Sequence, residues 1–149
     1  MFRGNHPAKV DEKGRLKLPS AFKQLMDAEN ITQFYITSSD GKSAQIWPLP
    51  VWEELEKKLA ANIHDESIEN YVNWTSYYGQ QVEIDNQSRL TLPQMLREEA
   101  KLTAEVAVIG KTKYVEVKNE GMLKQDLAAR PVNAVDRQKV AAVLLAEPE

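Results

Sequence analysis

The chain has 149 residues, of which 42% are apolar and 28% charged, and these fractions are typical of one compact globular unit. The absence of cysteine excludes disulfides, thiol catalysis and the common zinc sites. Neither a membrane-spanning apolar run nor the basic-then-apolar pattern of a signal peptide is present, so a cytoplasmic location is expected.

The net charge of −3 is unevenly distributed along the sequence. Residues 1–23 carry +4, and because the whole chain carries −3, the other 126 residues carry −7. A basic segment on an acidic body creates a local field that attracts phosphates. The alternative is an ordinary solvated charged face, and charge alone leaves both open.

The first part of the chain predicts a β-β-α-β-β order from its apolar periodicity and turn residues. The elements are expected, in order, as strands at 7–11 and 15–18, a helix at 19–27, and strands at 33–37 and 43–47. Within the helix, Phe22, Leu25 and Met26 are expected on the buried side.

The rest of the chain predicts connecting helices, a second half with the same order, and a tail. These elements are expected as helices at 51–61 and from 67, strands at 80–84 and 89–92, a helix at 93–101, strands at 105–109 and 113–117, and a helix at 121–129. The aromatic segment with Trp74, Tyr77 and Tyr78 is expected to form core or subunit contacts rather than a base-stacking platform. The apolar tail at 132–149 predicts a helix that docks elsewhere, for example on a neighbouring subunit.

A ten-residue motif occurs twice, 74 residues apart. Residues 10–19 and 84–93 share the pattern apolar-Asp-x-x-small-Arg-Leu-x-Leu-Pro. The pattern predicts a strand, a tight turn and a second strand whose two leucines lie on one buried face. One copy alone is more often an ordinary hairpin. Two matching copies indicate two similar half-domains that share one core.

The polar residues of the motif predict a structured loop. Asp11 precedes Arg15 by four residues, so its carboxylate is expected to hold the guanidinium across the turn, and the second copy repeats the pair. Gly14 can take a positive φ without steric penalty. Ser88 occupies this position in the second copy, where a positive φ costs about 1 kcal/mol, so the second loop is expected to have a different shape.

Three stretches together carry a resemblance to a known family. The opening Met1-Phe2-Arg3-Gly4, the loop Asp11-x-x-Gly14-Arg15-x-x-x-Pro19 with its second copy, and Trp47-Pro48-Leu49-Pro50-x-Trp52 resemble the MraZ family, the two-repeat bacterial members of the SpoVT/AbrB-like transcription factors. The resemblance covers residues 1–125 approximately. It implies an α+β, mostly β fold, in which tandem swapped-hairpin half-domains form a pseudo-two-fold barrel with connecting helices. The implied divisions are half-domains at 1–50 and 80–119, connecting helices at 51–79 and a helical tail at 120–149.

The resemblance also implies a function. It implies a sequence-specific DNA-binding transcriptional regulator, an autorepressor at the promoter of the division and cell-wall gene cluster. Its partners would be double-stranded promoter DNA and further copies of itself in a ring, in association with the nucleoid and without a cofactor, metal ion or small-molecule substrate. The implied DNA-binding residues are Arg3, Lys13, Arg15, Lys17 and Arg89, with Arg3 beside Arg15 and with Asp11, Gly14 and Asp85 supporting the loops.

Two other classes of function compete with DNA binding. The first is an antitoxin-like protein-interaction module of the AbrB type, although such antitoxins usually carry one copy of the loop and a disordered acidic tail. The second is an enzyme that uses Asp11 with Asp85, or His6 with His64. Each aspartate has a nearby arginine that would keep it ionised, and the histidines lack metal-ligand spacing, so an enzyme is not expected.

Overall fold

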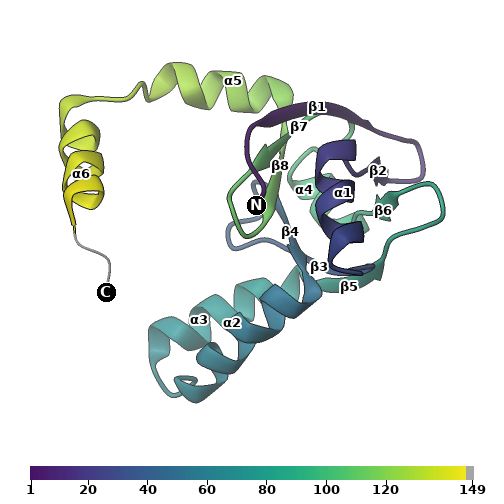
Figure 1. The fold of residues 1–149 in the computed structure, drawn as a ribbon, viewed down its shortest axis with the longest axis horizontal. Coiled ribbons are helices and arrows are strands. Elements are labelled where there is room, and N and C mark those ends of the chain that lie inside the picture. The colour runs from purple at the N-terminus through teal and green to yellow at the C-terminus, as the bar shows by residue number, and fades with distance from the viewer. Residues whose placement is uncertain (147–149) are drawn as a thin grey trace.

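The computed structural model describes residues 1–146, which contain eight strands and six helices (Figure 1). The strands are β1 (Asn5–Val10), β2 (Arg15–Lys17), β3 (Gln33–Thr37), β4 (Ala44–Pro48), β5 (Gln80–Glu83), β6 (Arg89–Thr91), β7 (Ala104–Gly110) and β8 (Val115–Asn119). The helices are α1 (Ser20–Ala28), α2 (Leu49–Ala61), α3 (Glu66–Tyr77), α4 (Gln94–Glu99), α5 (Glu120–Ala129) and α6 (Ala134–Leu145). The predicted order of elements is confirmed, and the boundaries shift by only a few residues; the end of the predicted tail, residues 147–149, lies outside the described residues.

The strands form one antiparallel sheet that curls into a nearly closed barrel. Their order is β5-β3-β4-β8-β7-β1-β2-β6, so β5 and β6 are the two edges. The second copy of the motif joins these edges directly, and the amide of Asp85 donates to the carbonyl of Arg89 across the joint at 3.0 Å. The α+β barrel implied by the resemblance is therefore confirmed.

The two halves of the barrel exchange strands. β1 of the first half pairs with β7 of the second, with His6 opposite Val108, and β5 of the second half pairs in the same way with β3 of the first. Leu16 lies opposite Leu90 in the β2–β6 pair. Because these leucines are equivalent in the two motif copies, the pseudo-two-fold axis passes between them. This exchange is the swapped-hairpin arrangement.

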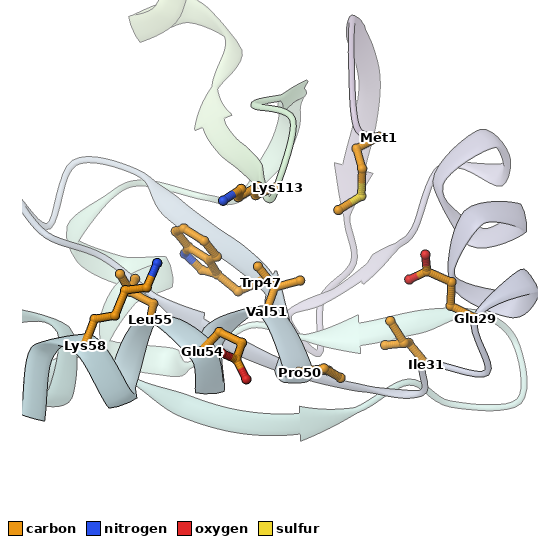
Figure 2. A pocket seen from close by; sticks show the side chains of 10 residues that line it. All are labelled: Met1, Glu29, Ile31, Trp47, Pro50, Val51, Glu54, Leu55, Lys58 and Lys113. Carbon is orange, nitrogen blue, oxygen red and sulfur yellow. The ribbon is translucent and has the colours of Figure 1, made fainter. Parts of the chain in front are cut away.

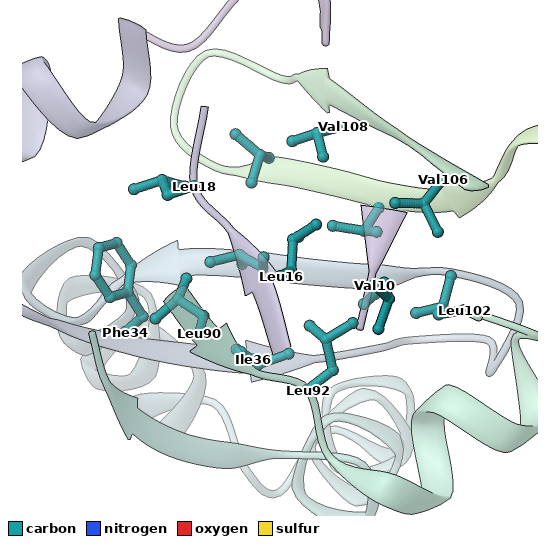
Figure 3. Close-up of a cluster of buried hydrophobic side chains, with 14 of the residues drawn as sticks. Val10, Leu16, Leu18, Phe34, Ile36, Leu90, Leu92, Leu102, Val106 and Val108 are labelled. Carbon is teal, nitrogen blue, oxygen red and sulfur yellow. The ribbon is translucent and has the colours of Figure 1, made fainter. Parts of the chain in front are cut away.

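The barrel interior is filled by the apolar residues of both motif copies together with those of other strands, such as Phe34 and Ile36 of β3 and Val106 and Val108 of β7 (Figure 3). Leu16, Leu90 and Leu92 are fully buried, which confirms the alternation predicted from the repeat. In α1, Phe22 and Met26 are buried, but Leu25 is 38% exposed and its predicted burial is wrong. Successive helical residues are rotated by about 100°, so Leu25 points well away from the direction of Met26.

The connecting helices pack on β3 and β4. The Trp52 ring of α2 stacks on Tyr35 at 4.6 Å between ring centroids. The hydroxyls of Tyr35 and Thr37 both donate to the carbonyl of Thr75 in α3, at 2.9 and 2.6 Å. Of the aromatic segment, Tyr78 is buried, whereas Trp74 and Tyr77 are 40% and 63% exposed, so the core interpretation holds for Tyr78 only.

The last two helices form an arm that extends from the barrel (Figure 1). Asn119 caps α5 by accepting from the amide of Met122 at 3.0 Å, and Asn133 and Asp136 form a capping box at the start of α6. No residue of α6 is buried against the described part of the chain. Among residues 1–146, no helix combines the length and apolar character needed to cross a bilayer.

Candidate nucleic-acid interface

A single carboxylate organises the first motif loop. Oδ1 of Asp11 accepts from the amides of Lys13 at 3.0 Å and Arg15 at 2.8 Å, and Oδ2 accepts from Nε of Arg15 at 2.8 Å. The amide of Gly14, whose φ is +78°, donates to the carbonyl of Asp11 at 2.9 Å. The predicted Asp–Arg contact across the turn is therefore confirmed, and the carboxylate also fixes the backbone.

The second loop has the same shape as the first. Asp85 accepts from the amides of Gln87 and Arg89 and from Nε of Arg89, at 2.8, 2.9 and 2.9 Å. Ser88 has a φ of +62°, close to that of Gly14. The expectation of a different shape is wrong, because these bonds to Asp85 offset the cost of a positive φ, which is about 1 kcal/mol.

Hydrogen bonding favours the charged form of both loop carboxylates. The pKa of Asp11 is lowered, and the largest cause is the hydrogen bond from the backbone N–H of Arg15. The pKa of Asp85 is lowered in the same way, first by the backbone N–H of Arg89. Partial desolvation opposes both shifts without reversing them. Each aspartate is therefore an ionised acceptor that positions an arginine.

The two strands after the loops pair with each other and form a basic surface. Arg15 lies opposite Thr91 and Lys17 lies opposite Arg89, on either side of the Leu16–Leu90 pair. Side chains alternate across a strand, so the buried leucines place these four residues on the outer face. We call the surface formed by Lys13, Arg15, Lys17 and Arg89 the basic ribbon.

The geometry of the basic ribbon suits an anionic ligand. Arg15 and Arg89 are diagonal neighbours, whose Cα atoms lie about 7–8 Å apart in such a pair. Both bonds to aspartate use Nε, so the terminal nitrogens of each guanidinium remain outside that contact. Lys17 directly opposes Arg89, and facing like charges destabilise a sheet. An anion bound between them would relieve this repulsion.

Both loops project from the same side of the barrel, away from the α5–α6 arm (Figure 1). The chain after each strand is also hydrogen-bonded to the loop of the other half. The amide of Leu18 donates to the carbonyl of Ser88 at 2.8 Å, and the amide of Leu92 donates to the carbonyl of Gly14 at 2.9 Å. The two loops therefore support each other, and the basic ribbon is a rigid unit built from both halves.

Arg3 is not part of the basic ribbon. Phe2 forms a bridge with Thr112, and the backbone of Arg3 lies against Gly110, so Arg3 lies beside the β7–β8 turn. This is the end of β1 remote from the first loop, and a strand of six residues spans about 20 Å. The expectation that Arg3 lies beside Arg15 of the same chain is therefore wrong.

One supporting residue was missed by the sequence analysis. Arg97 of α4 packs against Gly14, and its Nε donates to the carbonyl of Leu92 at 3.1 Å. The sequence did show a base after each motif copy, Lys23 in the first and Arg97 in the second. Nothing in that pattern shows that the side chain folds back under the loop of the other half.

An apolar groove lies apart from the basic ribbon, between α2, β4 and the amino terminus (Figure 2). Its volume is about 470 Å³. The apolar lining residues are Met1, Ile31, Trp47, Pro50, Val51 and Leu55, and the charged ones are Glu29, Glu54, Lys58 and Lys113. Within residues 1–146, no group of three or more His, Cys, Asp or Glu side chains is placed to hold a metal ion.

Comparison with known proteins identifies the family. The sequence matches the family described as "MraZ protein, putative antitoxin-like" over residues 1–71 and 79–120. The chain belongs to the MraZ family. The Transcriptional regulator MraZ of Acidobacterium capsulatum is 49% identical over 143 residues, covering 95% of this chain and 97% of that protein. The protein of the same name from Koribacter versatilis is 43% identical with the same coverage, and that of Thiobacillus denitrificans is 30% identical over 86% of this chain and 87% of its own.

The two more similar MraZ proteins also bear on the arm. The family match ends at residue 120, but alignments that cover 95% of this chain necessarily continue into the segment that forms α5 and α6. The arm is therefore not an appendage restricted to this chain, although it lies outside the part that defines the MraZ family.

Proposed function

We propose that this protein regulates transcription by inserting the basic ribbon into the major groove of double-stranded DNA. The observation that carries the proposal is that Arg15, Lys17 and Arg89 share the outer face of the β2–β6 pair, where the two arginines are half-buried and Lys17 is exposed. A two-stranded ribbon fits the major groove, and arginine forms paired hydrogen bonds to the O6 and N7 of guanine. Membership of a family whose curated members are named transcriptional regulators supports the same function.

The residues of the basic ribbon have different roles in this proposal. Arg15 and Arg89 contact base edges, because their aspartates hold each guanidinium in a fixed direction. Lys13 and Lys17 contact phosphates as flexible point charges. Arg3, at the far end of β1, is a separate phosphate contact outside the ribbon. Asp11, Gly14 and Asp85 maintain the loop shape.

The target and the direction of regulation rest on the resemblance. We propose that the bound DNA is the promoter of the division and cell-wall gene cluster, and that the protein represses its own synthesis there. A cytoplasmic location in association with the nucleoid follows from binding to that DNA. No cofactor, metal ion or small-molecule substrate takes part in this proposal.

We also propose that copies of the chain assemble into a ring. Two exposed apolar surfaces support self-association: the groove beside Trp47, and the arm, where Val143 and Leu144 are largely exposed. The two surfaces lie on different elements, which favours a head-to-tail contact that closes into a ring. A ring presents many basic ribbons to repeated promoter sites, so weak individual contacts gain avidity.

A titration of the purified protein against labelled DNA tests the proposed function. The duplexes are the chain's own upstream promoter and a shuffled sequence of the same length, each at two salt concentrations. We expect tighter binding to the promoter, and weaker binding to both duplexes as salt rises, because phosphate contacts release counterions. Equal affinity for promoter and shuffled duplex at both salt concentrations would contradict the proposal.

A protein-interaction module is the second candidate, because the family's description includes the words "putative antitoxin-like". The exposed Trp74 and Tyr77 on α3 offer a surface for such a partner. The same titration separates the two functions, since an interaction module would show no preference for the promoter.

A further inference from the structure

The two motif loops have nearly the same backbone but carry different side chains at their tips. Five equivalent hydrogen bonds organise each loop, and corresponding lengths differ by at most 0.2 Å. The tip of the first loop is Glu12-Lys13, and the tip of the second is Asn86-Gln87. Any difference in what the loops bind therefore comes from these side chains and not from loop shape.

The second tip has the chemistry of base recognition. Asn86 and Gln87 are exposed, and neither side-chain amide forms a hydrogen bond within residues 1–146. Asn and Gln amides each offer a donor and an acceptor that match N6 and N7 of adenine in the major groove. At the first tip, Glu12 repels phosphates and Lys13 attracts them. Neither side chain offers the paired donor and acceptor that adenine requires.

The strand pair beside the loops is also unsymmetrical in its side chains. Lys17 lies opposite Arg89, but the equivalent position opposite Arg15 is the neutral Thr91. The end of the ribbon at the second loop combines Lys17, Arg89 and Asp85, for a local charge of +1. At the first end the charges of Asp11, Glu12, Lys13 and Arg15 cancel, and the Arg97 guanidinium packed on Gly14 brings the local charge to +1 as well. The two ends therefore differ in which side chains they present and not in net charge.

We infer that the second loop is a specificity-determining element, in which Asn86 and Gln87 recognise adenine edges next to the base pair contacted by Arg89. The inference rests on the proposed DNA-binding function. Gln87 precedes Arg89 by two residues, so the amides reach within one or two base pairs of its contact. Because the first loop lacks these amides, one protomer recognises an unsymmetrical element and binds it in one orientation, despite its pseudo-two-fold barrel.

The test compares two double variants on a panel of promoter duplexes, each with one base pair replaced. In the Asn86→Ala/Gln87→Ala protein, we expect discrimination at one or two A·T positions to fall by about tenfold, the effect of losing a paired contact. The slope of affinity against salt should stay the same, because no charge is removed. Urea unfolding of both variants checks that these exposed substitutions leave the barrel intact.

The matched control is the Glu12→Ala/Lys13→Ala protein, altered at the equivalent positions of the first loop. It should keep the base discrimination of the wild type. The slope of log affinity against log salt concentration should fall by about one, since the phosphate contact of Lys13 is removed. If Asn86→Ala/Gln87→Ala retains full discrimination at every position, or weakens all duplexes equally, the inference is overturned. Failure of the proposed function would look different, because the wild type itself would then show no discrimination.

Discussion

The guanidinium of Arg97 occupies the space that a side chain at position 14 would need. A Cβ placed on Gly14 would overlap Cζ of Arg97. The contact joins the first loop to α4 of the second half, so the second half of the barrel helps to shape the loop of the first. Lys23, the repeat equivalent of Arg97, pairs instead with Asp27.

Gly14→Ala should destabilise the protein, because alanine must adopt a φ of +78° and displace Arg97. We expect the free energy of unfolding in urea to fall by about 1–2 kcal/mol. Ser88→Gly is the matched control at the equivalent position. It relieves a positive φ but adds backbone freedom to the unfolded chain, so its effect should stay below about 1 kcal/mol. If Gly14→Ala left the free energy of unfolding unchanged, the proposed strain at position 14 would be refuted.

The Asp11 carboxylate should stabilise the first loop at neutral pH and stop doing so in strong acid. Its pKa in the folded protein is lowered below the ordinary value of 3.8, so the stabilisation is complete above that pH. It is lost as pH falls through the lower, folded value. The carboxyl ¹³C shift of Asp11 should therefore titrate with a midpoint below 3.8, and a midpoint at or above 3.8 would contradict this. Arg15→Ala should raise the midpoint only partly towards 3.8, because the backbone N–H of residue 15, which the variant keeps, is the largest cause of the lowered pKa.

The candidate site was predictable to the extent that its chemistry is local. Asp11 and Arg15 are four residues apart, so the turn that joins them is encoded in the motif itself. The pairing of Lys17 with Arg89 and the packing of Arg97 on Gly14 depend on how distant strands align, which no local pattern contains. The predicted difference in shape between the two loops was wrong for a related reason. The positive φ of Ser88 is stabilised by hydrogen bonds to Asp85, which conformational propensity does not include.

Tyr78 should stabilise the protein below pH 10 and lose this effect in base. Its hydroxyl donates to Glu99, and that hydrogen bond is the main reason why its pKa is raised to about 12 from 10.0. The unfolded chain ionises first, so stability falls as pH rises from 10 towards 12. The difference in free energy of unfolding between the wild type and Tyr78→Phe should shrink over this range. A constant difference up to pH 11 would show that the bond to Glu99 has no such role.

Removal of residues 130–149 should reduce the size of the assembly and leave the barrel folded. No residue of α6 is buried within the described chain, and Leu144 is 77% exposed, so the segment adds little to the barrel core. Sedimentation should show a smaller particle, with an unfolding midpoint close to that of the full chain. Leu144→Lys should weaken assembly in the same direction. An unchanged sedimentation profile for both variants would exclude the arm as a subunit contact.

The fold was more predictable than the way its strands pair. The periodicity of Leu16 and Leu18, with their counterparts Leu90 and Leu92, identifies both hairpins and their buried face. Whether β1 pairs with β3 or with β7 depends on the sheet as a whole, and only the resemblance predicted the exchange. At the edge of a helical stripe, burial depends on what packs there, and Leu25 remained exposed for that reason.

The central claim, that the basic ribbon is the DNA-binding element, is tested most directly by its two arginines. Promoter affinity should be measured for Arg15→Ala, Arg89→Ala and the double variant, with Lys57→Ala, an exposed base on α2, as the control. Each single variant should weaken specific binding by about 1–3 kcal/mol. The double variant should lose most of the preference for promoter over shuffled duplex, and Lys57→Ala should match the wild type. Wild-type affinity in the folded double variant would contradict the account.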